Sequence, residues 1–194
     1  MKYSNFFLNE IINVAKKIDL TKLERLCMTL SEVRKKKGRV FFLGVGGSAG
    51  NASHAVNDFR KLCNLECYSA TDNVSELTAR INDEGWDSSF SNWLKISNLN
   101  SKDAIFILSV GGGNLKKKIS VNIVEAIKFA KRKNSKILGI VGKKDGYTYN
   151  NADIAIHIPN SVANLVTPIS ESYQAIIWHC LVSHPILQQN KTKW

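Results

Sequence analysis

The sequence contains no long apolar run. None of its hydrophobic stretches approaches the roughly 20 residues that a helix needs to span a bilayer. The opening stretch MKYSNFFLNE holds too short an apolar run before Glu10 to resemble a secretory signal. We therefore expect a cytoplasmic protein. The hydrophobic content of 44% and the charged content of 22% are typical of a globular fold with a full-sized core.

Cysteine is also scarce. The chain has four cysteines, Cys27, Cys63, Cys67 and Cys180, and no two of them form a Cys-x-x-Cys pair. This spacing excludes the common thiolate zinc motifs and argues against a disulfide framework. We therefore expect four reduced thiols.

Acidic residues are few. The sequence has 16 of them against 27 lysines and arginines, which gives a formal net charge of +11. A basic surface can bind nucleic acid, but the chain carries no recognised nucleic-acid motif, and its positive charges fall in short clusters. We favour lysine-rich helix ends in contact with solvent and expect no nucleic-acid partner. A phosphorylated substrate would also benefit from the positive field.

The N-terminal part of the sequence has a helical pattern. Apolar side chains recur at helical spacing over residues 6–15 and again over residues 20–30. Thr21 and Glu24 resemble a capping box at the start of the second segment, and Gly38 follows its basic last turn. We expect an N-terminal helical hairpin over residues 1–37.

Short apolar runs follow the hairpin. Four are almost continuously apolar, RVFFLG (39–44), AIFILSV (104–110), KILGIVG (136–142) and ADIAIHIP (152–159), and a weaker one spans 66–70. Such runs are typical of strands buried on both faces. Helical segments are expected between and after them, at about 50–63, 74–81, 87–97, 119–132 and 165–182. This alternation predicts a single α/β domain over 1–194, in which 38–194 form a parallel sheet, covering helices and a long C-terminal helix.

Two glycine-rich turns, LGVGGSAGN and LSVGGGN, stand at the carboxyl ends of expected strands. Ligands of parallel sheets bind at these ends, where glycines allow close backbone approach and helix N-termini attract anions. Ser48 and Ser109 add hydroxyl donors. Residues 44–49 match the dinucleotide fingerprint weakly, because Glu66 begins the next strand instead of ending it, and no Gly-Lys-Ser/Thr of a P-loop is present. The pair of turns favours a pocket for a small anion.

Histidine and carboxylate residues are paired on two expected helices. His54 and Asp58 are one helical turn apart and therefore share a face. Glu171 and His179 are eight residues apart on the C-terminal helix, which leaves them about 80° apart around its axis. If the two helices meet, the four side chains can form a zinc site or an acid–base pair.

These motifs, together with TDNVSELTARINDEGW and ESYQAIIWH, resemble the sugar isomerase (SIS) family and, within it, the phosphoheptose isomerases. The resemblance extends to about residue 187. It implies a three-layer α-β-α sandwich with a five-stranded parallel sheet, and a homotetramer with active sites at subunit contacts. The implied reaction converts sedoheptulose 7-phosphate to D-glycero-D-manno-heptose 7-phosphate through an enediolate, in the biosynthesis of lipopolysaccharide or capsule heptoses.

The resemblance also implies roles for individual residues. It implies that Asp58 and His179 exchange protons with the substrate, and that zinc is bound by His54, Asp58, Glu171 and His179. It implies a substrate pocket lined by Gly46, Gly47, Ser48, Asp83, Ser109, Gly111, Gly112, Gly113, Asn114 and Glu171. The chain departs from the family pattern at Asp58, where glutamate is usual, and at Glu171, where glutamine is usual. The second glycine turn has fewer hydroxyls than is usual in the family. Backbone amides and a nearby lysine would therefore bind the anion in place of those hydroxyls.

Two alternatives stay open at the level of the sequence. A residue bound to zinc is a poorer base, so the roles of Asp58 as ligand and as base compete. The alternative function is a non-catalytic SIS module that binds a sugar phosphate or a protein partner, or an isomerase of another sugar phosphate. Retention of both histidines and both carboxylates favours the enzyme, because a pure binding module does not need them.

Overall fold

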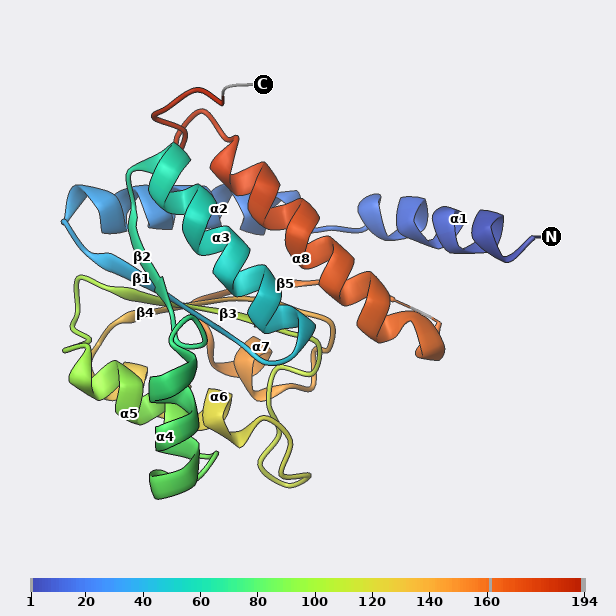
Figure 1. Ribbon diagram of the computed structural model, residues 1–194. Helices are drawn as coiled ribbons and strands as arrows, with labels where there is room; N and C mark the ends of the chain where they lie inside the picture. Colours follow the sequence, from blue (N-terminus) through green and yellow to red (C-terminus); the bar gives the residue numbers. More distant parts are fainter. Residues whose placement is uncertain (1, 161, 193–194) are drawn as a thin grey trace.

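The computed structural model describes residues 2–160 and 162–192. At its centre lies a parallel sheet of five strands in the order β2-β1-β3-β4-β5 (Figure 1). The strands are β1 (Arg39–Gly44), β2 (Glu66–Ser69), β3 (Ala104–Ser109), β4 (Lys136–Val141) and β5 (Ile154–His157). Each of the expected apolar runs therefore forms a strand, and β5 is shorter than its run.

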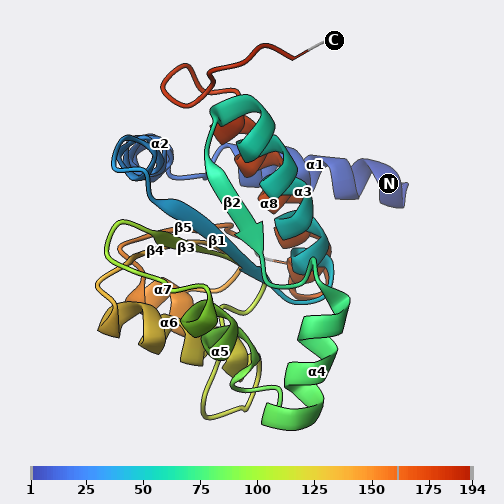
Figure 2. The same ribbon diagram turned by 60° about the vertical axis from the view of Figure 1, so that its left-hand side comes forward.

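Helices cover both faces of the sheet and complete the expected three-layer sandwich (Figures 1 and 2). One face carries α2 (Leu20–Lys35), α3 (Gly47–Cys63) and α8 (Val166–Val182). The other carries α5 (Ser89–Ile96), α6 (Val121–Arg132) and α7 (Tyr147–Asn151), of which α7 was not expected from the sequence. A 3₁₀ turn, Ala163–Leu165, precedes α8. None of the helices in the described ranges is both long and apolar enough to cross a bilayer.

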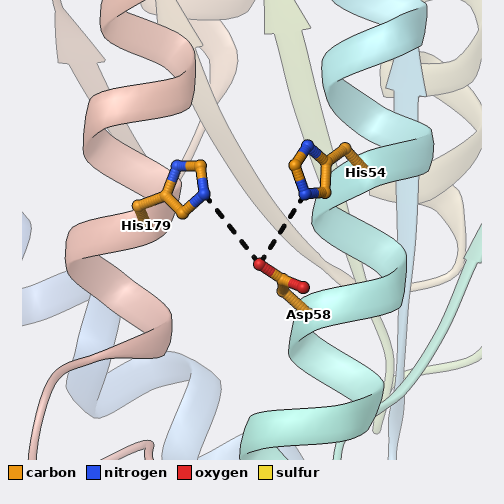
Figure 3. Close-up of side chains that lie close together, drawn as sticks. All are labelled: His54, Asp58 and His179. Carbon is orange, nitrogen blue, oxygen red and sulfur yellow. Dashed lines mark ion pairs between the residues drawn. The ribbon is translucent and has the colours of Figure 1, made fainter. Parts of the chain in front are cut away.

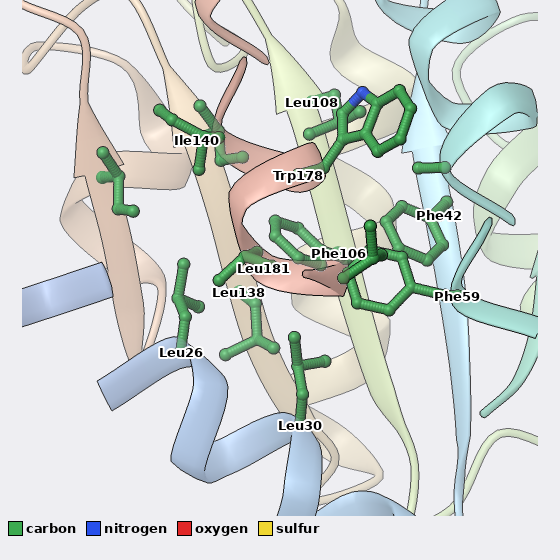
Figure 4. Close-up of a cluster of buried hydrophobic side chains, with 14 of the residues drawn as sticks. Leu26, Leu30, Phe42, Phe59, Phe106, Leu108, Leu138, Ile140, Trp178 and Leu181 are labelled. Atoms are coloured by element: carbon green, nitrogen blue, oxygen red, sulfur yellow. The ribbon is translucent and has the colours of Figure 1, made fainter. Parts of the chain in front are cut away.

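The sheet separates two apolar cores, because successive strand residues point to opposite faces. Phe42 and Phe106 face α3 and α8, and their rings stack with centroids 5.1 Å apart (Figure 4). Phe41 and Ile105 face the opposite core, together with side chains of α5 and α6. Because both faces are covered, the strands read as continuous apolar runs rather than alternating ones.

The two N-terminal helices are present, but they do not fold back on each other as a hairpin. In both views α1 (Tyr3–Ala15) leads away from α2 (Figures 1 and 2). Val14 is the only residue of α1 that is buried. The reason lies in α2, whose apolar stripe, including Leu26 and Leu30, is buried in the core beside the sheet. Because α2 has one apolar stripe, and this stripe packs toward the sheet, α2 has no second apolar face for α1 to pack against.

All four cysteines are free thiols, as the sequence predicts. Cys27, Cys63 and Cys67 are buried. Burial raises the pKa of Cys27 to about 12 and that of Cys63 to about 11, and it also raises the pKa of Cys67. These three thiols therefore stay protonated at neutral pH, and they serve as small apolar core residues.

Candidate active site

The candidate active site lies between α3 and α8. Ala52 and Ala55 of α3 are fully buried and carry no side chain beyond Cβ, so a neighbouring helix can approach closely. This packing brings His179 of α8 to face His54 and Asp58 of α3 (Figure 3). The sequence predicts that His54 and Asp58 share a helix face, whereas the approach of His179 depends on the tertiary packing.

The three side chains form a compact cluster. Nε2 of His54 lies 3.9 Å from Oδ2 of Asp58, and Nε2 of His179 lies 4.0 Å from the same oxygen. One ligand atom from each residue lies within 4.8 Å of the other two. The imidazoles of His54 and His179 are 58% and 53% exposed, whereas the Asp58 side chain is 17% exposed. Both rings are thus open to a ligand while the carboxylate lies between them.

A cavity of about 360 Å³ opens onto this cluster. Besides the three clustered residues it is lined by Asn57, Lys61, Val182 and Thr192, among others. Its wall therefore combines two imidazoles, a carboxylate and a lysine. These are side chains that can move protons and bind an anionic small molecule.

The orientation of His179 is fixed by two neighbours in α8. Its Nδ1 lies 2.8 Å from the carbonyl oxygen of Ala175. A carbonyl only accepts, so Nδ1 carries a proton, and Nε2 is the ring atom that faces Asp58. The Trp178 indole stacks on the His179 ring, with centroids 3.5 Å apart and an angle of 27° between the planes. A backbone carbonyl behind a histidine is the usual arrangement for a metal-ligating ring.

Glu171 lies elsewhere, next to the first glycine turn. A Cβ on Gly47 would lie 2.5 Å from Oε2 of Glu171, so the carboxylate occupies the space in front of this glycine. The expected four-residue metal set is therefore reduced to three residues in this structure. The physical reason is that eight residues of α-helix separate Glu171 and His179 by about 12 Å along the axis of α8. The carboxylate lies instead at the N-terminus of α3, where the helix dipole favours negative charge.

Comparison with known proteins identifies the family. A phosphoheptose isomerase of Campylobacter jejuni is 30% identical over 164 residues, which are 82% of this chain and 80% of that protein. The chain belongs to the phosphoheptose isomerase family. A lincomycin biosynthesis protein of Streptomyces lincolnensis is 28% identical over 158 residues, or 76% of this chain, and the match spans only 56% of that longer protein. No model of a protein family matches the chain.

The fold agrees with this assignment to the phosphoheptose isomerase family. The structure of a phosphoheptose isomerase from Francisella tularensis superposes with a TM-score of 0.80, and the match covers 96% of each chain at 21% identity. The SIS fold expected from the sequence motifs is therefore confirmed. In phosphoheptose isomerases as in other parallel α/β proteins, the carboxyl ends of the strands are where ligands are expected.

Both glycine turns of this family member lie at such ends, after β1 and β3. Gly46, Gly112 and Gly113 have φ values of +63°, +71° and +79°, which favour glycine. The Ser109 hydroxyl accepts a hydrogen bond from the amide of Gly112 at 3.0 Å, and its side chain is buried. Ser48, in the first turn of α3, is only 2% exposed. Both serines thus lie within the turns, and Ser109 holds the shape of the second one.

The remaining predicted substrate residues are spread more widely. Gly111 lies in the second turn, and Asn114 forms an antiparallel bridge with Ile119. Asp83 is exposed on α4 (Val74–Glu84), which has no buried residue and lies away from α3 and α8 in both views (Figures 1 and 2). Within one chain Asp83 does not join the His54 cluster.

The other two histidines, His157 and His184, have local partners outside the cluster. Nε2 of His184 lies 3.2 Å from the carboxylate of Glu24. His157, at the end of β5, packs its ring against Tyr149 with centroids 6.1 Å apart. Burial lowers the pKa of His157, and the charge of Lys144 lowers it further.

Sequence reasoning missed the residues that support the cluster. Asn51 and Gln174 hydrogen-bond across α3 and α8, Trp178 packs under both imidazoles, and Lys61 lines the cavity. The available signal was spacing: Asn51 lies three residues before His54, and Trp178 directly precedes His179. Which helix they would face could not be read from the sequence.

Proposed function

We propose that this chain is an aldose–ketose isomerase that interconverts sedoheptulose 7-phosphate and D-glycero-D-manno-heptose 7-phosphate. The observation that carries the proposal is the cluster of His54, Asp58 and His179 in a chain 30% identical to a phosphoheptose isomerase. Isomerisation of this kind needs a base next to a carbonyl, an acid, and a stabiliser for the enediolate oxygen. The cluster contains groups for each of these tasks.

The proton transfers follow from the positions of the side chains. The Asp58 carboxylate removes a proton from C1 of the ketose, and the electron pair forms the C1–C2 double bond of the enediolate. Protonated Nε2 of His179 stabilises the developing charge on the C2 oxygen and donates its proton to it. Return of the carbon-bound proton to C2, with loss of the C1 hydroxyl proton to His179, gives the aldose. Asp58 and His179 line the same cavity.

The cluster also fits a metal ion. Two ligands at about 2.0–2.1 Å from one tetrahedral zinc ion lie about 3.3–3.4 Å apart. The separations of 3.9 Å and 4.0 Å to Asp58 exceed this by about 0.6 Å, so small side-chain rotations bring these atoms to the spacing of a zinc site. We propose that His54, Asp58 and His179 hold zinc, which would polarise the substrate oxygens when bound. Asp58 would then contribute as a ligand at the expense of its strength as a base, and Nε2 of His179 would bind the ion in place of carrying a proton.

The metal proposal predicts how much metal the purified protein contains. Protein purified without a histidine tag is expected to contain close to one equivalent of a transition metal by elemental analysis. Removal of that metal with a chelator is expected to lower activity, and addition of Zn²⁺ is expected to restore it. Full activity with less than about a tenth of an equivalent would exclude an essential metal and leave Asp58 as the base.

The reaction itself is tested by NMR. Sedoheptulose 7-phosphate incubated with the purified protein in D₂O is expected to yield the aldose with deuterium at C2, because the abstracted proton exchanges with solvent. Binding of the sugar phosphate without any aldose or deuterium exchange would instead support the non-catalytic SIS module.

We further propose that the two glycine turns bind the sugar phosphate. The turns offer backbone amides and the N-terminus of α3, which attract an anion. Ser48 and Asn114 belong to the same two turns, and Lys116 and Lys117 follow closely enough to add positive charge.

Replacing Ser109 with alanine tests the second turn. Loss of its hydroxyl leaves the amide of Gly112 without its acceptor, at a cost of about 1–3 kcal/mol. We expect affinity for sedoheptulose 7-phosphate, measured by calorimetry, to fall about ten-fold or more, with metal content unchanged. Ser91→Ala, in which a hydroxyl bonded within α5 is removed, is the matched control. Equal affinities of Ser109→Ala and the wild type would place the phosphate elsewhere.

Assembly into a homotetramer is the last part of the proposal. Tyr3, Leu8 and Ile12 on α1 are 68%, 59% and 52% exposed, and Ile176 on α8 is 49% exposed. Exposed apolar side chains on a helix that leads away from its own sheet favour burial against another subunit. A second subunit could also bring the Asp83 region of α4 to a site. Light scattering is expected to give four chains per particle, and a monomer at micromolar concentration would exclude this.

A further inference from the structure

A second contact joins α3 and α8 on the side of the cluster nearer the glycine turns. Nδ2 of Asn51 donates to the carbonyl oxygen of Glu171 at 3.0 Å and to Oε1 of Gln174 at 3.1 Å. Gln174 is fully buried. Asn51 lies three residues before His54 on α3, and Gln174 lies five residues before His179 on α8. The amide pair therefore links the two helices about one turn away from the cluster.

The orientation of this amide pair is determined by its chemistry. The backbone carbonyl of Glu171 accepts and cannot donate, so Asn51 must present its NH₂ group to it. The second N–H of that group faces Gln174, which must therefore present its oxygen. Nε2 of Gln174 points away and has no partner among the described residues. The hydrogen bond from Asn51 therefore fixes the oxygen of Gln174, and not its NH₂ group, at this place.

At the cluster itself, an aromatic contact limits how closely α3 and α8 approach each other. The Trp178 side chain is fully buried, and its ring centroid lies 4.6 Å from that of His54 and 3.5 Å from that of His179. The indole keeps the helices from closing further, whereas the amide pair keeps them from separating. The cluster thus lies beside one contact that opposes closer approach of the helices and one that opposes their separation.

The spacing of α3 and α8 bears directly on the metal geometry. The two separations to Asp58 are 3.9 Å and 4.0 Å, against about 3.3–3.4 Å for two ligands of one tetrahedral zinc ion. The distance between the helices therefore determines how far the side chains must turn for His179 and Asp58 to share an ion. Polar contacts close to the cluster are the features best placed to control this distance.

We propose that Asn51 and Gln174 are positioning residues that set the spacing of α3 and α8 at the His54, Asp58 and His179 cluster. Neither residue belongs to the cluster or to the described lining of the cavity beside it. The inference rests on the proposed function, because this spacing matters only if the three side chains act on one ion or one substrate. The two amides are neutral, so they fix the distance without adding charge to the site.

The test compares Asn51→Ala, Gln174→Met and the double variant. Methionine keeps the length of glutamine and fills the same space, but it cannot accept the Asn51 hydrogen bond. Zn²⁺ binding is measured by calorimetry on the metal-free protein, and Co²⁺ is used as a spectroscopic probe of the ligand geometry. We expect each single variant to bind Zn²⁺ about ten-fold more weakly and to change the visible absorption of bound Co²⁺. The double variant is expected to lose less than the sum, because both changes remove one interaction.

Controls separate positioning from general stability. Asn92→Ala makes the same substitution at a hydrogen-bonded asparagine of α5, on the other face of the sheet, and is expected to bind Zn²⁺ like the wild type. Urea unfolding is measured for every variant. Variants that unfold more easily but keep wild-type Zn²⁺ affinity and Co²⁺ spectra would overturn the positioning role.

The proposed function can fail independently of the positioning role. If the wild type binds neither Zn²⁺ nor Co²⁺, the zinc part of the proposed function is wrong. The positioning role of Asn51 and Gln174 is then tested by steady-state kinetics of the variants. In that case a fall in kcat with little change in KM supports positioning of Asp58 and His179. Unchanged kcat in Asn51→Ala and Gln174→Met overturns it.

Discussion

Replacement of His179 with alanine is expected to lower kcat by about 10²–10⁴-fold, the range for loss of a general acid–base group. The imidazole faces Asp58 across 4.0 Å, and its Nδ1 lies 2.8 Å from the carbonyl oxygen of Ala175, which fixes the ring with Nε2 toward the cavity. Binding of sedoheptulose 7-phosphate should change little, since the proposed phosphate contacts lie in the glycine turns. Steady-state kinetics and calorimetry with the same preparation measure the two effects.

His184→Ala provides the matched control for this experiment. His184 lies just beyond the end of α8 and pairs with Glu24 at 3.2 Å, outside the cluster. We expect it to keep wild-type kcat. If His179→Ala turns over within ten-fold of the wild type, the proton transfers proceed without this ring, and the proposed mechanism is wrong.

Replacement of Asp103 with alanine is expected to have the largest effect on stability. Its carboxylate is 2% exposed and lies 2.8 Å from Nη2 of Arg39. It also accepts the backbone amides of Arg39 at 2.9 Å and of Asn100 at 3.0 Å. The hydrogen bond that Arg39 donates to Asp103 raises the pKa of its guanidinium. An arginine stays charged at neutral pH without such a partner, so Asp103→Ala leaves the positive charge of Arg39 in place. Removal of the carboxylate leaves the backbone amides of Arg39 and Asn100 without their acceptor, at a cost of about 1–3 kcal/mol each.

Urea unfolding followed by circular dichroism measures this cost. A loss of this size is a large fraction of the roughly 5–15 kcal/mol that stabilises a typical domain. Glu76→Gln is the control, because Glu76 pairs with Arg80 one turn away on α4 at a more exposed position, where such pairs contribute about 0.3–0.5 kcal/mol. Equal unfolding midpoints for Asp103→Ala and Glu76→Gln would show that the Arg39 pair does not stabilise the start of β1.

Much of the fold could be predicted because it depends on local patterns. Continuous apolar runs identified the strands, and the glycines at the ends of β1 and β3 identified the turns, since only a few residue types tolerate those conformations. The short helix α7 was missed because Tyr147–Asn151 has too few residues to show a period. The motifs also indicated the family, which the comparison with the Campylobacter jejuni relative confirmed.

The sequence by itself determined that His54 and Asp58 share a helix face, because four residues make about one helical turn. Only the tertiary structure decided that His179 meets them, that Glu171 lies beside Gly47 instead, and that α1 leads away from α2. These outcomes depend on how helices far apart in the chain pack on one sheet. The spacing along one helix is fixed by backbone geometry, whereas the spacing between helices is set by the side chains that meet there.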